Sequence, residues 1–212
     1  MEPTELEGVA ESAYREAGLD VERPNVVRLA KALLGPDAIE RGPRLVSGRA
    51  ALIRVHDRWR IVLSRSLPKL YALHAIGHEL GHWLLERAGV GSGDEELAAD
   101  YLGGALLAPR SAFAAAHRAL GSDLPALAAA FSTTETGAAL RVGEVARVPL
   151  AVISPSVVRV RGPEGWVWPD EPTLRRWARG TAAPGLKKIR LTDDPRRVVL
   201  DADAAAAAGE DR

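Results

Sequence analysis

The stretch LHAIGHELGHWLL, residues 73–85, carries three of the chain's five histidines inside a segment that is otherwise almost entirely apolar. Its apolar residues recur at helical spacing, which predicts a largely buried helix that begins after Pro68 and ends near Gly89. Polar groups on such a helix need partners, because burying an imidazole or a carboxylate without one is costly. The histidines of this helix therefore predict a binding site.

Residues 78–82 read His-Glu-Leu-Gly-His, so that His78 and His82 stand one helical turn apart on one face. Two imidazoles in this arrangement can hold one metal ion, since each ligand nitrogen can approach it to about 2.0–2.1 Å. Glu79 is rotated to one side, where it suits the role of general base in hydrolysis better than that of a third ligand. The alternative is a pair of ordinary polar histidines on an amphipathic helix, and the apolar flanks weaken it.

The third ligand should come from the next helix. A catalytic zinc ion usually has three protein ligands, and a chain without cysteine must supply them as His, Asp or Glu. Residues 94–109, DEELAADYLGGALLAP, predict a helix that packs antiparallel against the first, with Glu96 as the ligand and Asp100 as an acceptor that orients a ligand imidazole. Stabilisation of the helix dipole suits Glu95 and could account for both glutamates. Glycines 103–104 predict a close approach of the two helices.

The other histidines are weaker candidates. His74 lies one turn before His78 on the same face, where it could bind substrate or stabilise an oxyanion, but a hydrogen bond at the rim of the core is the favoured interpretation. His56 is expected on an exposed hairpin turn. His117 is expected on a later helix and is not expected to reach the site.

The composition describes a globular chain of 212 residues, 47% of them hydrophobic, with a formal net charge of +0. A net charge of zero gives the chain as a whole no electrostatic attraction to nucleic acid or to anionic lipid. No apolar run is long enough to span a membrane, and the N-terminus lacks the apolar core of a signal peptide. We therefore expect a cytoplasmic protein without a membrane partner.

The remaining pattern predicts helices and short strands. The first helix should open with a capping box at Thr4 and Glu7 and end at Gly18, and a later one with a capping box at Ser132 and Glu135. A small antiparallel sheet is expected between the second helix, 24–35, and the histidine helix, with strands at 44–48, 49–56 and 58–64. After Pro149 we expect a basic helix at 172–180 and strands at 150–154, 157–162, 165–168, 187–191 and 196–200.

GHELGHWLL followed by EELAADYLGGALLAP resembles the ImmA/IrrE family of metallopeptidases. The second motif of that family reads Glu-x-x-Ala-(Asn/Asp), then an apolar segment, then Leu-Leu-x-Pro. The positions here are Glu96, Ala99, Asp100, Leu106, Leu107 and Pro109.

This resemblance implies His78, His82 and Glu96 as the ligands of a Zn²⁺ ion, with Mn²⁺ as a possible substitute, and Glu79 as the general base. It implies an α+β fold with a thermolysin-like zincin core, in which an edge strand within 59–64 pairs with an extended substrate. Family members typically cleave helix-turn-helix transcriptional repressors in the cytoplasm, which relieves repression in stress, mobile-element or phage-defence circuits.

The expected domains are residues 1–147, a zincin-like metallopeptidase with a helix-turn-helix-like segment at about 122–147, and residues 148–212, a small β-rich region with a disordered tail. The segment at 122–147 is expected to pack rather than to bind DNA, because its second helix offers few base-reading side chains. The C-terminal region interleaves tryptophans with basic residues. That pattern could bind single-stranded DNA as an activating ligand, although tryptophans more often form the core of such a region. The residues concerned are Trp166, Trp168, Trp177, Arg175, Arg176, Arg179, Lys187, Lys188 and Arg190.

Two other functions stay open at this point. One is a non-catalytic regulator that binds metal and a partner on the same scaffold. The other is a metallopeptidase with an unrelated substrate.

Overall fold

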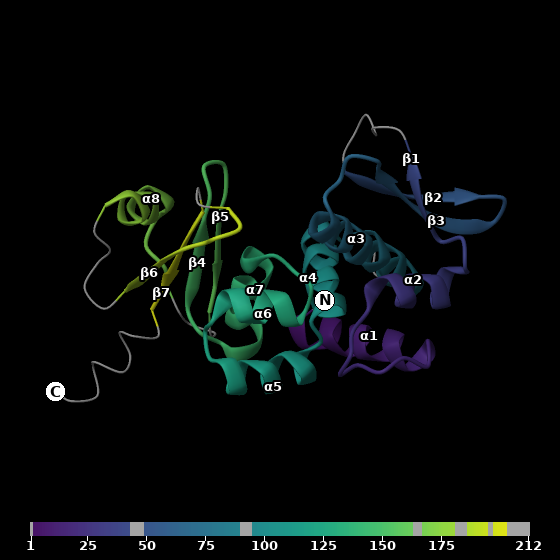
Figure 1. Ribbon diagram of the computed structural model, residues 1–212, viewed down its shortest axis with the longest axis horizontal. Coiled ribbons are helices and arrows are strands. Elements are labelled where there is room, and N and C mark those ends of the chain that lie inside the picture. Colours follow the sequence, from purple (N-terminus) through teal and green to yellow (C-terminus); the bar gives the residue numbers. More distant parts are fainter. Residues whose placement is uncertain are drawn as a thin grey trace. The chain divides into compact units, whose positions relative to one another are not determined.

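The computed structural model describes residues 2–42, 49–89, 95–162, 167–180, 186–194 and 197–202, and it combines helices with two small sheets (Figure 1). The expected α+β class is confirmed. The chain divides into two compact units, unit 1 with residues 1–115 and 131–133, and unit 2 with residues 116–130 and 134–212. No helix in the described ranges is long and apolar enough to cross a membrane.

The helices of unit 1 are α1 (Pro3–Glu16), α2 (Val26–Leu34), α3 (Lys69–Arg87) and α4 (Glu95–Leu107), and α5 (Arg110–Leu120) begins in this unit. The capping box of α1 was expected at Thr4 and Glu7, and this expectation is wrong by two residues. Glu2 and Glu5 form it, because Pro3 with its fixed φ takes the first helical position. Glu7 is buried instead, and it accepts a hydrogen bond of 2.8 Å from the hydroxyl of Tyr101.

The sheet of unit 1 contains β1 (Ile39–Gly42), β2 (Ala50–Val55) and β3 (Arg58–Ser64) in the order β1-β3-β2. The hairpin turn between β2 and β3 is confirmed: His56 and Asp57 both have positive φ, the geometry that matches the twist of paired strands. The strand expected at 44–48 lies outside the described residues. The sheet is not purely antiparallel as expected, because β1 pairs with β3 in parallel.

The expectation of an edge strand within 59–64 is wrong. β3 has a partner on each side, so its backbone groups already pair within the sheet. Among the described strands, β1 and β2 are the two edges of this sheet, and β2 also contacts α3.

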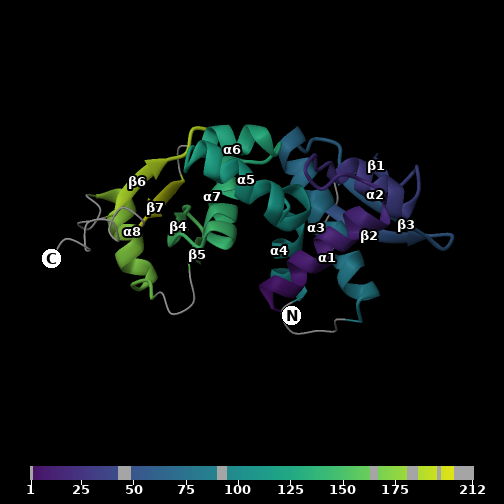
Figure 2. The same ribbon diagram turned by 90° about the horizontal axis from the view of Figure 1, so that it is seen from below.

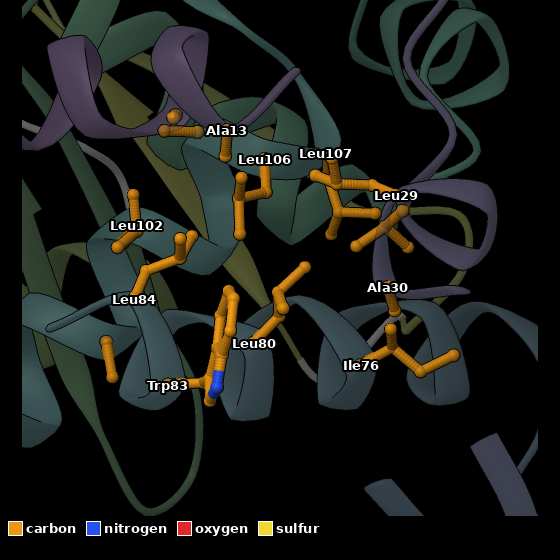
Figure 3. Close-up of a cluster of buried hydrophobic side chains, with 14 of the residues drawn as sticks. Ala13, Leu29, Ala30, Ile76, Leu80, Trp83, Leu84, Leu102, Leu106 and Leu107 are labelled. Carbon is orange, nitrogen blue, oxygen red and sulfur yellow. The ribbon is translucent and has the colours of Figure 1, made fainter. Parts of the chain in front are cut away.

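The core of unit 1 is built from side chains of its four helices and its sheet, and it holds α3 in place (Figure 3). Burying one such leucine stabilises the fold by about 1.5–3 kcal/mol. The hydroxyl of the buried Tyr14 on α1 donates a hydrogen bond of 2.7 Å to the carbonyl oxygen of Leu106 at the end of α4. The labelled members in Figure 3 are Ala13, Leu29, Ala30, Ile76, Leu80, Trp83, Leu84, Leu102, Leu106 and Leu107.

Glycines bring α3 and α4 into backbone contact. A Cβ atom on Gly81 would lie 2.9 Å from the carbonyl oxygen of Ala99, and one on Gly103 would lie 2.9 Å from the backbone nitrogen of His78. Gly77 faces Gly103 in the same way, at 2.9 Å from its carbonyl oxygen. The predicted close approach of the two helices is therefore confirmed at Gly103, and it brings side chains near the start of α4 within reach of α3.

Unit 2 contains α6 (Leu124–Ala130), α7 (Glu135–Arg141) with a following π-helical turn (Val142–Ala146), and α8 (Glu171–Arg179). Its antiparallel sheet has the order β5-β4-β7-β6, and α8 packs against β4 and β7 (Figure 2). The strands are β4 (Leu150–Ile153), β5 (Val158–Arg161), β6 (Lys187–Arg190) and β7 (Val198–Asp201).

Two local expectations for unit 2 are wrong. Ser132 does not cap α7, because its φ is positive; the side chain of Thr134 accepts a hydrogen bond from the backbone nitrogen of Gly137 instead. Val167 and Trp168 form no strand, while the preceding residues 165–166 lie outside the described ranges. The indole nitrogen of Trp168 donates to the carbonyl oxygen of Arg161, at 3.2 Å, and this side-chain contact takes the place of strand pairing.

Polar contacts of the buried Glu135 connect α7 to the rest of unit 2. The carboxylate of Glu135 accepts hydrogen bonds from the backbone nitrogen and the hydroxyl of Thr192, and the backbone nitrogen of Glu135 donates to Asp193. These contacts join α7 to a segment near the C-terminal end of the same unit. The predicted boundary at 147/148 stays a prediction about which parts fold independently.

Candidate metal centre

Three of the predicted site residues converge where α3 meets α4. The Nε2 atoms of His78 and His82 lie 3.1 Å apart. Both face the carboxylate of Glu96, with distances of 3.5 Å from His78 Nε2 to Oε2 and 3.4 Å from His82 Nε2 to Oε1. Ligand atoms of all three residues lie within 4.8 Å of one another. Two adjacent turns of α3 and the first turn of α4 thus place two imidazoles and one carboxylate around a single point.

The spacing of these atoms fits a tetrahedral metal ion. Ligand atoms that each lie about 2.0–2.1 Å from one zinc ion at tetrahedral angles are about 3.3–3.4 Å apart. The Nε2–Nε2 distance of 3.1 Å is close to that value, and each imidazole nitrogen has a different carboxylate oxygen of Glu96 within 3.5 Å. The donor set of two histidines and one glutamate is also one that zinc commonly has in hydrolytic sites. The residues present therefore fit the ion that the sequence implies.

The far sides of both imidazoles are held by carboxylates of α4. His78 Nδ1 lies 2.9 Å from Asp100 Oδ1, and His82 Nδ1 lies 3.1 Å from Glu95 Oε1. An ionised carboxylate only accepts hydrogen bonds, so each neutral imidazole carries its proton on Nδ1 and turns a bare Nε2 toward the shared point. Two lone pairs 3.1 Å apart repel each other unless a cation or a proton lies between them.

Asp100 contacts His78 as the sequence predicted, whereas the contact of Glu95 was missed. Its position in the first turn of a helix offered the helix dipole as a sufficient explanation. The signal that could have found it is the antiparallel pairing of the helices, in which the residue before Glu96 faces the later histidine of the motif.

Burial and neighbouring charges shift two pKa values at the site. The hydrogen bond that His78 donates to Asp100 raises the pKa of His78, and partial burial works against this. Burial raises the pKa of the Glu79 carboxyl, while the charge of His78 and the backbone N–H of Leu52 work in the opposite direction. Leu52 belongs to β2, so the carboxylate proposed as the base lies beside both the histidines and the edge strand.

In the described ranges, the group that could hold a metal ion does not include the remaining histidines. His74 Nε2 lies 2.7 Å from the hydroxyl of the buried Thr133, the kind of hydrogen bond that the sequence favoured for it. His56 is exposed on the hairpin turn, and His117 is half-buried on α5. Neither belongs to the group that could hold a metal ion in the described ranges.

Some of the basic and aromatic residues of unit 2 make structural contacts. Trp168 and Trp177 pack against the core of that unit, and Trp166 lies outside the described residues. Arg175 Nη1 donates to the carbonyl oxygen of Ser154 at 2.7 Å. Lys188 Nζ donates to the carbonyl oxygen of Gly180 at 2.8 Å.

Comparison with known proteins identifies the part of the chain that holds this site. Residues 42–142 match the Peptidase_M78 family model, described as the IrrE N-terminal-like domain. A solved structure, a Mycobacterium tuberculosis transcriptional regulator, is similar with a TM-score of 0.65 over 96% of this chain and 90% of that chain. Its sequence identity is 16%, so this likeness shows the fold alone. No curated protein matches the sequence. The matched segment contains both motifs on which the resemblance depends, and residues 42–142 of this chain therefore form an IrrE N-terminal-like domain of the Peptidase_M78 family.

Proposed function

We propose that this chain is a zinc-dependent endopeptidase of the ImmA/IrrE type that cleaves a helix-turn-helix transcriptional repressor in the cytoplasm and so relieves repression. The observation that carries the proposal is the convergence of His78 Nε2, His82 Nε2 and Glu96 at distances that suit one tetrahedral ion. The family match of residues 42–142 supports peptidase activity.

Each residue of the site has a distinct part in the proposed reaction. His78, His82 and Glu96 would hold the ion, and Asp100 keeps His78 in the tautomer that leaves Nε2 free. When bound, a zinc ion lowers the pKa of a water molecule and polarises the scissile carbonyl group. Glu79 takes a proton from the attacking water and passes it to the leaving amine, a role for which a raised carboxyl pKa is well suited.

The sheet offers a place for an extended substrate. β2 pairs with β3 on one side and ends the described order β1-β3-β2, so its other edge can accept a further strand. Because Leu52 of β2 lies beside Glu79, a peptide paired with this strand would pass the base.

The regulatory substrate is supported more indirectly. The similar Mycobacterium tuberculosis protein is named a transcriptional regulator, and the ImmA/IrrE resemblance implies a repressor as substrate. Single-stranded DNA as an activating ligand stays a prediction of the sequence pattern.

The test is cleavage of a helix-turn-helix repressor encoded beside this chain, incubated with the purified protein and Zn²⁺. We expect cleavage by the wild type and a rate at least about 100-fold lower for Glu79→Gln, the typical contribution of a general base. Glu86→Gln, which alters an exposed glutamate of the same helix, is the matched control and should cleave normally. Undiminished cleavage by Glu79→Gln would defeat the proposal.

Two alternatives make different forecasts in the same experiment. A non-catalytic metal-binding regulator would bind the repressor without cutting it. A fourth protein ligand to the metal would favour that function. Within the described ranges, the group that could hold a metal has three members. A peptidase with an unrelated substrate would leave the repressor intact but would lose activity on a generic unfolded protein when Glu79 is replaced.

A further inference from the structure

The two imidazoles at the metal centre are supported in the same way, but only one support belongs to the family motif. Asp100 contacts His78, and it occupies the Asn/Asp position of that motif. Glu95 contacts His82 with an Nδ1 to Oε1 distance of 3.1 Å, and it precedes the motif. Both partners come from α4, so the pairing of α3 with α4 supplies a ligand and two carboxylate supports together.

We propose that Glu95 is a positioning residue that fixes the tautomer and the ring orientation of His82. This inference rests on the proposed metal site. A carboxylate at Nδ1 keeps the proton on that nitrogen, so Nε2 presents a lone pair to the point shared with His78 and Glu96. With the proton on Nε2 instead, His82 would present a donor there and could not act as a ligand.

Neighbouring glutamates thus have separate roles. The carboxylate of Glu96 faces the Nε2 atoms of both histidines, at 3.4 and 3.5 Å. Glu95 contacts the opposite nitrogen of His82. The side chain of Glu95 is 46% exposed, and that of His82 is 19% exposed. A pair this accessible to water adds little to the stability of the fold, so its main effect falls on metal binding.

The helix dipole offers a competing explanation for Glu95, and one pair of variants separates the two. Glu95→Gln removes the negative charge that favours the start of a helix but keeps an oxygen that can accept from His82 Nδ1. Glu95→Ala removes both. A dipole effect would therefore give the two variants equal properties, whereas a positioning role ranks the glutamine variant between the wild type and the alanine variant.

The experiment measures Zn²⁺ affinity of the full chain by competition with a fluorescent zinc chelator. We expect Glu95→Ala to lower the affinity about 10- to 100-fold, the usual consequence of losing such a partner, and Glu95→Gln to lower it less. Glu86→Ala should bind as the wild type does. Thermal denaturation of the metal-free variants should give unchanged midpoints.

A second readout does not depend on metal. In ¹H–¹⁵N spectra of the histidine rings of the metal-free protein, His82 should carry its proton on Nδ1 in the wild type and should show mixed tautomers in Glu95→Ala. This readout keeps the inference testable even if the wild type fails to cleave a repressor.

Two results would overturn the inference. One is wild-type zinc affinity and an unchanged ring spectrum in Glu95→Ala. The other is a loss of affinity as large as that of Glu96→Ala, which would make Glu95 a ligand and not a support. Cleavage by Glu79→Gln would defeat the proposed function while leaving the role of Glu95 intact.

Discussion

The two units of this chain use their charged residues in opposite ways. In unit 1, the carboxylates around the histidines remain accessible: the side chain of Glu96 is 81% exposed and that of Asp100 is 40% exposed. In unit 2, the ion pair of Arg141 and Glu144 is buried, with side chains 3% and 6% exposed. Exposed groups that converge on one point can bind a metal ion, whereas buried groups paired with each other hold the fold together. The candidate metal centre of unit 1 is thus built from accessible side chains, whereas this ion pair of unit 2 is buried.

The largest expected effect is on metal binding. Glu96→Ala should weaken Zn²⁺ affinity by more than the roughly 100-fold that the loss of an orienting partner can cost, because it removes a ligand itself. The thermal midpoint of the metal-free protein should stay unchanged, since the side chain is mostly in water. Chelator competition and thermal denaturation measure the two quantities. Wild-type zinc affinity in this variant would show that the exposed carboxylate of Glu96 does not bind the ion, and the contrast with the buried charges of unit 2 would fail.

The opposite result is expected in unit 2. Glu144 lies 3.2 Å from Arg141 Nη1 and 2.9 Å from Arg161 Nε, so Glu144→Gln removes the negative charge between two guanidinium groups. Weakening a buried pair in this way should lower the free energy of unfolding by about 3 kcal/mol. Urea denaturation measures the loss, and zinc affinity should not change.

Glu171→Gln is the matched control for this charge removal. Its carboxylate pairs with Arg175 at 2.7 Å, but the glutamate side chain is 57% exposed. The expected cost is at most about 1 kcal/mol, as for other exposed pairs. Equal losses for Glu144→Gln and Glu171→Gln would contradict the structural role of the buried pair.

More of the candidate site than of the surrounding fold could be predicted from the sequence. Two imidazoles one turn apart leave few geometries for a shared ligand, so the sequence placed His78, His82 and Glu96 together, although their binding of metal is still to be tested. The support from Glu95 could not be read in the same way, because it depends on how two helices are rotated against each other.

The sheet of unit 1 shows why strand order is harder to predict. The turn at His56 and Asp57 fixes β2 against β3, since two residues suffice for an antiparallel hairpin. β1 pairs in parallel with β3, which is distant in sequence, and no local sequence pattern predicts this pairing. The error about the edge strand followed from this missing neighbour. The caps predicted at Thr4 and Ser132 failed for a local reason, because residues two positions away cap the two helices instead.

A smaller effect is expected from the contact that makes the site possible. Gly103→Ala places a Cβ atom 2.9 Å from the backbone nitrogen of His78, so α3 and α4 must move apart. We expect a loss of about 1–3 kcal/mol in the free energy of unfolding, partly offset by the higher helix propensity of alanine. Zinc affinity should fall as well, because Glu96 and Asp100 move with α4.

Gly8→Ala is the control, since a Cβ atom there meets nothing within 4 Å on the helix α1. Helix propensity alone should then raise the stability by up to about 1 kcal/mol. If both alanine variants were more stable than the wild type, α3 and α4 would have space for a Cβ atom at Gly103. The claim that glycine is required for their close contact would then be wrong.

The smallest effect is expected for single-stranded DNA and the exposed basic residues of unit 2. Trp168 and Trp177 pack against the core, so they offer little of the open aromatic surface on which bases stack. Arg176, Arg179, Lys187 and Arg190 are exposed and can still contact phosphate groups. We expect weak binding of a labelled oligonucleotide that falls steeply with salt and disappears when these four residues are replaced by alanine. Arg175 and Lys188 are left intact in this variant because they donate to backbone carbonyl groups. If tight binding at physiological salt survived the four substitutions, unit 2 would have a DNA-binding surface elsewhere. Its charged residues would then bind nucleic acid as well as stabilise the fold.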